Sequence, residues 1–325
     1  MSKIGVLGGG AWGTALAENN AKNGRDVILW ARESDVIESI NTHHENSVFL
    51  PTVMLSKTLK ATSDLKTACD VDAILVVTPA QYVRQILKDI AGFVKEGQPV
   101  VICAKGIEIE TGKLLSQVLE EEIPHAICAV MTGPTFASEI AHGKPSAMTL
   151  ALTDKDAARA LQEMLGSQTL RTYITEDVIG TQLGGAVKNV IAIACGIIHG
   201  LDFGESARAA LVTRGLAEMG RLASAMGANK ETLTGMCGIG DLMLTCSSLQ
   251  SRNFSLGVLL GQGKTLEEIL ATRNSVTEGV HTSKALMTLA TNNAVEMPIA
   301  EAVYSCLNEN MPVEEAVRTI LERPL

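Results

Sequence analysis

Short apolar runs alternate with helix-like stretches in the first half of the chain. Residues 3–7 and 26–30 have the length and composition of buried strands, and residues 14–23 between them have helical spacing and precede Gly24. Buried strands that alternate with helices predict a parallel sheet with helices on both faces. More strands are predicted at 73–77, 100–104 and 126–131, with two further apolar runs at one sheet edge, 147–152 and 170–174, and with helices near 82–90 and 113–121.

The second half has a different pattern. After about Asp177 the β-branched runs disappear, and helical spacing continues to the C-terminus, as in residues 207–226. Thr265 and Glu268 form a predicted capping box, and Pro298 and Pro312 stand where they could end or begin helices. No long linker separates the halves, so we predict a direct join between a sheet domain and an all-α domain.

Composition and charge narrow the classes of function. The chain has 325 residues, a 46% hydrophobic share and a formal net charge of -9, which together predict two globular domains without a general nucleic-acid surface. A local group of Lys and Arg can still bind an anionic substrate. The seven cysteines are scattered and form no Cys-x-x-Cys pair, which predicts reduced thiols in a cytoplasmic protein and no metal site.

One apolar stretch, residues 178–201, raises the alternative of a membrane span. Lys188 is its only fully charged side chain, and a lysine at the centre of a span costs about 3 kcal/mol. We therefore predict a buried helix and no membrane insertion.

The N-terminal strand runs into a glycine-rich segment. Gly8, Gly10 and Gly13 form a Gly-x-Gly-x-x-Gly pattern between a predicted strand and a predicted helix. The first glycine permits a tight turn, the second a close approach of backbone to a pyrophosphate, and the third close packing of helix on strand. This context predicts an α/β Rossmann-type parallel-sheet domain that binds NAD(P), residues 1–176, followed by an all-α substrate-binding and catalytic domain, residues 177–325.

The end of the second strand bears on the choice between NAD and NADP. An acidic residue there bonds the ribose 2′-hydroxyl, whereas an arginine accepts a 2′-phosphate. The chain has Arg32 followed by Glu33, so NADP is favoured and NAD stays possible. A solvated surface charge is the alternative interpretation of Arg32.

Chemistry-bearing residues in the second half include Lys188, which has apolar neighbours on both sides. Burial lowers the pKa of a lysine and suits it to general acid–base work, although a snorkelling or ion-paired lysine is equally compatible with the pattern. Asp241 stands beside Gly240, where it could orient a lysine or a substrate hydroxyl. Ser251, Arg252 and Asn253 precede a predicted helix and suit a phosphate, with N-capping as the alternative for Ser251 and Asn253.

Seven motifs in a fixed order make a more specific pattern. The motifs lie at residues 8–13 with Trp12, 103–108, 133–137, 183–189, 240–242, 250–253 and 276–280. With these motifs in this order, the chain resembles bacterial NAD(P)-dependent glycerol-3-phosphate dehydrogenases over almost its whole length.

The resemblance implies a role for each matching residue. Lys188 would exchange the proton with substrate, assisted by Lys105 and Asp241, with Thr245 and Asn189 in support. The residues implied to contact the cofactor are Gly8, Gly10, Ala11, Trp12, Gly13, Arg32, Phe49, Lys105, Ala137, Arg252, Val276 and Glu278. The residues implied to contact the substrate are Lys105, Gly133, Thr135, Lys188, Asp241, Ser251, Arg252 and Asn253.

The activity implied by the resemblance is reversible reduction of dihydroxyacetone phosphate to sn-glycerol 3-phosphate, for phospholipid synthesis, by a homodimer. Another dehydrogenase of similar layout, acting on a 3-hydroxyacid or on 6-phosphogluconate, is the nearest alternative. It would not require the 251–253 cluster. A sensor that binds NAD(P)H without turnover is a second alternative.

Overall fold

The predicted strands of the first half are present in the computed structural model, which describes residues 2–273 and 276–322. β1 (Lys3–Leu7) and β2 (Asp26–Trp30) have the predicted bounds. The remaining strands of the main sheet are β5 (Lys60–Thr62), β6 (Ala73–Val76), β7 (Pro99–Ile102), β8 (Ile127–Thr132), β9 (Ser146–Ala151) and β10 (Leu170–Thr175).

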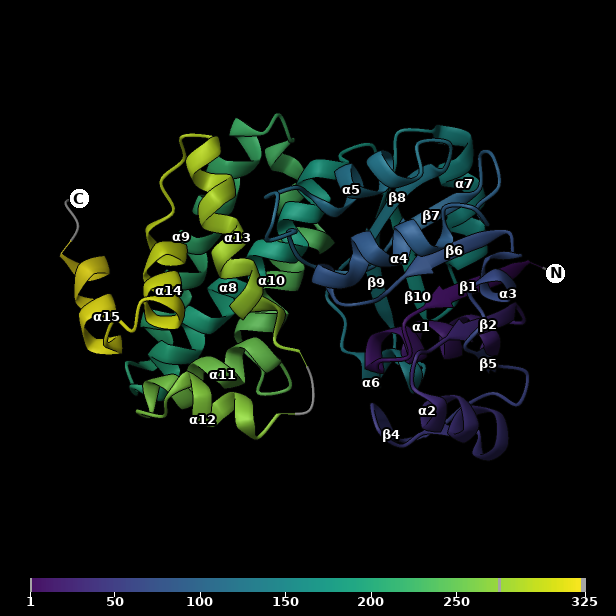
Figure 1. Ribbon diagram of the computed structural model, residues 1–325. Helices are drawn as coiled ribbons and strands as arrows, with labels where there is room; N and C mark the ends of the chain where they lie inside the picture. Colours follow the sequence, from purple (N-terminus) through teal and green to yellow (C-terminus); the bar gives the residue numbers. More distant parts are fainter. Residues whose placement is uncertain (1, 274–275, 323–325) are drawn as a thin grey trace. The chain divides into compact units, whose positions relative to one another are not determined.

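The eight strands lie in the order β10-β9-β8-β7-β6-β1-β2-β5 (Figure 1). Every neighbouring pair is parallel except β8 and β9, so the prediction of a parallel sheet holds with one antiparallel pairing near the edge. The chain turns to one side of β1 to form β2 and to the other side to form β6. In a sheet of this kind, ligands bind beyond the carboxyl end of the strand where the order reverses. That position is the end of β1, where the glycine-rich segment begins.

Helices flank the sheet, and their apolar residues recur at helical spacing. In α4 (Val83–Ile90) the buried residues are Val83, Ile86, Leu87 and Ile90, which form one face. The other helices of this part are α1 (Ala11–Lys22), α2 (Ser34–Glu38), α3 (Leu65–Cys69), α5 (Leu115–Glu122), α6 (Ala137–Ala141) and α7 (Lys155–Leu165), with a π-helical turn at Ser39–His43 and a 3₁₀ turn at Ala80–Tyr82.

The second half is helical, as predicted. Thr265 and Glu268 form the capping box of α12, and Pro298 occupies the first turn of α14. The helices are α8 (Val178–Gly200), α9 (Gly204–Ala225), α10 (Asp241–Cys246), α11 (Arg252–Gly261), α12 (Leu266–Ala271), α13 (Glu278–Asn292), α14 (Pro298–Asn308) and α15 (Val313–Leu321), with short turns at Lys230–Thr234 and Met236–Gly240.

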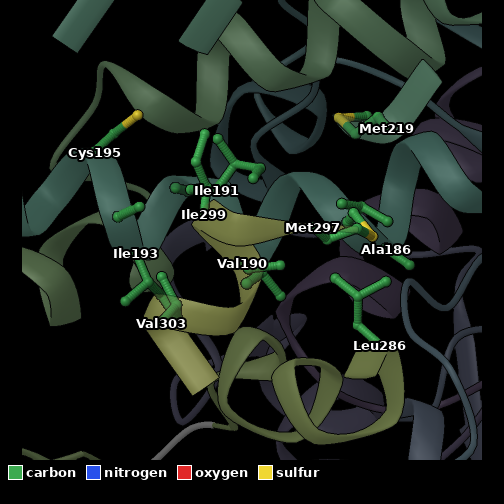
Figure 2. Close-up of a cluster of buried hydrophobic side chains, with 14 of the residues drawn as sticks. Ala186, Val190, Ile191, Ile193, Cys195, Met219, Leu286, Met297, Ile299 and Val303 are labelled. Atoms are coloured by element: carbon green, nitrogen blue, oxygen red, sulfur yellow. The ribbon is translucent and has the colours of Figure 1, made fainter. Parts of the chain in front are cut away.

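Helix α8 is the centre of this helical part. By length and composition alone it could cross a membrane, but 83% of its most apolar 18-residue window is buried inside the protein. Figure 2 shows Val190, Ile191 and Ile193 of this helix among Met219 and Leu286 from other helices. The packing favours the predicted core helix, because the apolar side chains of α8 are covered by protein.

The chain divides into two compact units. Met1–Ala104 and Leu115–Val178 form the first, and Lys105–Leu114 and Ile179–Leu325 form the second. The units differ from the predicted division at residue 176 chiefly in Lys105–Leu114. This segment groups with the helices because Ile107 and Leu114 are fully buried in the core around α8.

Candidate functional site

The glycine-rich turn at the end of β1 has the geometry that its sequence predicts. Gly8 has φ of +136°, a conformation that side-chain-bearing residues rarely adopt. A Cβ on Gly13 would lie 1.9 Å from the backbone oxygen of Gly8, so only glycine lets α1 start this close to the turn. A Cβ on Gly10 would meet no atom within 4 Å, so the space beside this residue is open.

Replacing Gly13 with alanine should therefore distort the turn. Because the clash is with backbone, the turn or α1 has to shift, at a cost of about 2 kcal/mol in the free energy of unfolding. We expect weaker dinucleotide binding as well, measured by calorimetric titration alongside urea unfolding. Gly24→Ala is the control for loss of a glycine. Gly24 has φ of +79°, and a Cβ there would meet no atom within 4 Å, so the substitution should lower the free energy of unfolding without weakening dinucleotide binding.

The start of α1 fits a pyrophosphate. No side chain caps the helix, and its first turn holds no acidic residue, so the N–H groups and the helix dipole face no competing anion there. The Nε1 atom of Trp12 is buried without a hydrogen-bond partner among the described residues. An uncapped helix start beside an unsatisfied donor is compatible with a bound anionic cofactor.

Two predicted cofactor residues flank this turn within the sheet unit. Arg32 follows β2, and its side chain is 78% exposed, 3.5 Å from a carboxylate oxygen of Glu33. Phe49 lies between β3 (Glu45–Asn46) and β4 (Leu50–Met54), a hairpin that the sequence analysis did not identify. Phe49, Ala11 and Trp12 are partly buried against the same apolar core.

The residues predicted after β8 are close in sequence; Gly133 is buried, and Thr135 and Ala137 are partly buried. The Thr135 hydroxyl donates to the Gly133 backbone oxygen at 3.4 Å, and Ala137 begins α6. A Cβ on Gly133 would approach the Cα of Met148 to 2.8 Å, so this position accepts only glycine without rearrangement. The backbone at Gly133 therefore lies directly against β9.

In the helical unit, two lysines converge on one carboxylate. The Lys188 Nζ donates to Asp241 Oδ1 at 2.6 Å, and the Lys105 Nζ donates to Asp241 Oδ2 at 2.8 Å. Lys188 also donates to the Thr245 hydroxyl at 2.8 Å, which itself donates to the backbone oxygen of Asp241. The Asp241 side chain is fully buried, and Lys188 is 6% exposed. The structure thus joins the three predicted catalytic residues through Asp241.

Burial has a clear effect on Lys188. Desolvation lowers its pKa from 10.5 to about 8, against the opposing attraction of Asp241 and with some help from the neighbouring charge of Lys105. Lys188 is thus an ion-paired lysine, as the alternative interpretation predicted. Its ion pair with Asp241 does not, however, raise its pKa back to the ordinary value of 10.5. A lysine with a pKa of about 8 exchanges a proton near neutral pH.

The polar cluster at the start of α11 combines capping with contacts to other helices. The Ser251 hydroxyl accepts from the Phe254 N–H at 3.2 Å as N-cap, the alternative considered for it. Asn253 does not cap the helix. Its Nδ2 donates to Asn189 Oδ1 at 2.8 Å, and its Oδ1 accepts from the Gly279 N–H at 2.9 Å.

The predicted cofactor residues of the helical unit lie around the same helix start. Arg252 is exposed, and the carboxylate of Glu278 is near enough to interact with its charge. Glu278 begins α13, and Val276 precedes it in the connecting segment. Arg273 donates to the Arg252 backbone oxygen at 2.7 Å, a contact that the sequence analysis did not identify.

The comparisons with known proteins point to one family. A family model described as the N-terminus of NAD-dependent glycerol-3-phosphate dehydrogenase matches residues 3–158, and the corresponding C-terminus model matches residues 177–318. A glycerol-3-phosphate dehydrogenase (NAD(P)+) from Parvibaculum lavamentivorans is 55% identical over 322 residues, covering 99% of this chain and 97% of that protein. A protein of the same name from Maricaulis maris is 51% identical over 321 residues, covering 99% and 96%.

A solved structure is similar over its full length. The crystal structure of glycerol-3-phosphate dehydrogenase from Coxiella burnetii has a TM-score of 0.95 and 38% sequence identity to this chain, and the match covers 99% of each. With both halves matched in sequence and the whole fold matched in structure, the chain belongs to the NAD-dependent glycerol-3-phosphate dehydrogenase family of oxidoreductases.

Proposed function

We propose that this protein reversibly reduces dihydroxyacetone phosphate to sn-glycerol 3-phosphate with NAD(P)H, and so supplies glycerol 3-phosphate for phospholipid synthesis. The observation that carries the proposal is the contact of buried Lys188 and buried Asp241 with partly buried Lys105, in a member of this family. Lys188, with a pKa of about 8, can carry the proton, and the carboxylate of Asp241 orients its amine.

The sheet unit binds the dinucleotide in this proposal. The turn at Gly8, Gly10 and Gly13, with the uncapped start of α1, holds the pyrophosphate. The exposed Arg32 suits a 2′-phosphate, so NADP is favoured over NAD. When bound, the reduced dinucleotide supplies the hydride.

The helical unit binds the substrate phosphate at the start of α11. Arg252 is exposed and offers a guanidinium fork, and the helix start adds partial positive charge. Ser251 uses its oxygen to cap the helix, which leaves its hydroxyl proton as a donor to a phosphate oxygen. Capping and phosphate binding are thus compatible in one side chain.

Lys188 carries the proton. A lysine ammonium has three donors, and Asp241 and Thr245 accept two of them. The third donates to the carbonyl oxygen during reduction, and neutral Lys188 accepts the hydroxyl proton during oxidation. Asp241, which Lys105 binds through its other oxygen, holds the amine in place, and the burial of Lys188 excludes competing water.

The proposal includes a cytoplasmic homodimer with no nucleic-acid or membrane partner. All seven cysteines, each within the described ranges, carry free thiols, as expected in a reducing compartment. In this proposal, residues 1–176 provide most of the cofactor contacts and residues 177–325 provide the proton carrier and the phosphate site. Size-exclusion chromatography with light scattering tests the dimer.

The decisive test of function is a substrate comparison. Purified protein should oxidise NADPH, and NADH more slowly, with dihydroxyacetone phosphate, and should reduce 3-keto acids far more slowly. In the reverse direction, with NADP+, it should oxidise 6-phosphogluconate far more slowly than glycerol 3-phosphate. Equal or faster turnover of those compounds would contradict the substrate assignment. Tight NADPH binding with no turnover of any substrate would favour a sensor.

The proton transfer by Lys188 should make the rates of reduction and oxidation depend on pH in opposite ways. Reduction needs protonated Lys188, so kcat/KM for dihydroxyacetone phosphate should fall tenfold per pH unit above a pKa of about 8. Oxidation needs neutral Lys188, so kcat/KM for glycerol 3-phosphate should rise up to about pH 8 and level off above it. Initial rates in both directions check this, and two profiles that bend in the same direction would contradict it.

A further inference from the structure

The Asn46 side chain connects the glycine-rich turn to the β3–β4 hairpin within the sheet unit. Asn46 is fully buried, and its Nδ2 donates to the Gly9 backbone oxygen and to the Thr14 hydroxyl, each at 2.8 Å. Its Oδ1 accepts from the Phe49 N–H at 3.1 Å, which fixes which end of the amide faces the turn. Thr14 donates in turn to the same Gly9 oxygen at 3.3 Å.

These contacts determine the orientation of the peptide between Gly9 and Gly10. A trans peptide is planar, so its C=O and N–H groups point in opposite directions. Because Asn46 and Thr14 hold the Gly9 C=O toward the buried side, the Gly10 N–H points away from them. A Cβ on Gly10 would meet no atom within 4 Å, so there is room beside this residue, and in the proposed function its N–H donates to the pyrophosphate.

Side-chain packing cannot hold this peptide, because both of its residues are glycines and populate more backbone conformations than other residues. Turned over, the peptide would present a carbonyl oxygen to the phosphates in place of an N–H donor. We infer that Asn46, acting with Thr14, is a positioning residue for the dinucleotide: it holds the Gly9–Gly10 peptide so that the Gly10 N–H can bind phosphate.

Asn46 also fixes the segment that carries Phe49, because its Oδ1 accepts a hydrogen bond from the Phe49 N–H. Asn46 lies in β3, and Phe49 follows three residues later, so one amide fixes both the phosphate-binding turn and the segment that carries Phe49. Loss of Asn46 should therefore weaken cofactor binding more than loss of Thr14, which contacts the turn and the amide but not Phe49. This inference rests on the proposed binding of NAD(P) at the turn.

The experiment measures NADPH binding directly by calorimetric titration of the full chain. Asn46→Leu removes the amide at similar size and should raise the Kd of NADPH about 10-fold to 100-fold. With cofactor at saturation, kcat and the KM for dihydroxyacetone phosphate should stay within twofold. Thr14→Val should raise the Kd several-fold, and Thr14→Ser, which keeps the hydroxyl, should restore it.

Asn41→Leu is the control for loss of an amide that bonds at both ends, at a more exposed position. Asn41 also uses both ends of its amide, donating to the Ala61 oxygen and accepting from the Ala61 N–H, each at 2.9 Å, but it does not contact the glycine turn. It should lower the melting temperature without raising the Kd. The inference is overturned if Asn46→Leu raises the Kd no more than Asn41→Leu does.

The two hydroxyl variants keep the inference testable if Asn46→Leu does not fold. Equal Kd values for Thr14→Val and Thr14→Ser would overturn it, whereas a raised Kd for the valine variant alone supports it. Failure of the unsubstituted protein to bind NADPH would instead contradict the proposed function. The outcomes for the two proposals are therefore distinct.

Discussion

Lys188→Met should lower kcat for the reduction of dihydroxyacetone phosphate about a thousandfold, because it removes the proton donor and leaves a side chain of similar length. The protein should remain folded. Asp241 keeps Lys105 as its partner at 2.8 Å, so the substitution leaves a neutral ion pair and no isolated buried charge. Single-turnover rates with NADPH, together with calorimetric cofactor binding, separate the loss of chemistry from a loss of binding.

The control for this prediction is another lysine of the same unit. Lys284 is exposed on α13, and Lys284→Met should leave kcat within twofold of the original. The residual activity of Lys188→Met should also lose its dependence on pH around 8, because the titrating group is gone. A rate within fivefold of the unsubstituted enzyme would exclude Lys188 as the proton carrier and point to another base.

The sequence predicts most strands of the sheet because they are short, mainly apolar runs. A glycine directly after β1 and a charged residue directly before β2 interrupt the apolar pattern, and the limits of both strands agree with the prediction. The hairpin of β3 and β4 was missed because Leu50–Met54 has a proline at its second position and only two buried residues. β5 was missed because it has three residues, too few for a periodic pattern.

The site was predictable to a different degree in its two parts. The glycine spacing identifies the turn because Gly8 and Gly13 answer local steric needs, seen in the positive φ of Gly8 and in the clash that a side chain on Gly13 would cause. The ion pairs of Asp241 depend on tertiary structure, since Lys188 precedes it by 53 residues and Lys105 by 136. Local pattern carries no signal for such pairs, and only the resemblance to the family grouped these residues. Asn46 was missed for the same reason, because its contacts lie 32 and 37 residues away.

Asp241→Asn should cost the enzyme both stability and activity. An amide of the same shape offers one oxygen where the carboxylate offers two, so one of the two lysines loses its acceptor. Loss of an ion-pair partner at a fully buried position costs about 3 kcal/mol in the free energy of unfolding. Because Asp241 raises the pKa of Lys188, its neutralisation should move that pKa below about 8.

The pH profile is the measurement that identifies this effect. Lower protonation of Lys188 at neutral pH, added to the loss of orientation, should reduce kcat/KM for reduction about a hundredfold at pH 7.5, with the alkaline limb displaced to lower pH. Glu218→Gln is the matched control, since Glu218 is also a buried carboxylate of this unit, 2% exposed, and accepts from the Ile299 N–H at 2.9 Å. Glu218→Gln should lower the free energy of unfolding and leave the alkaline limb of the pH profile at its original pH. If both variants leave the limb unmoved, Asp241 serves only to hold α10 in the fold, and the pKa of Lys188 has another origin.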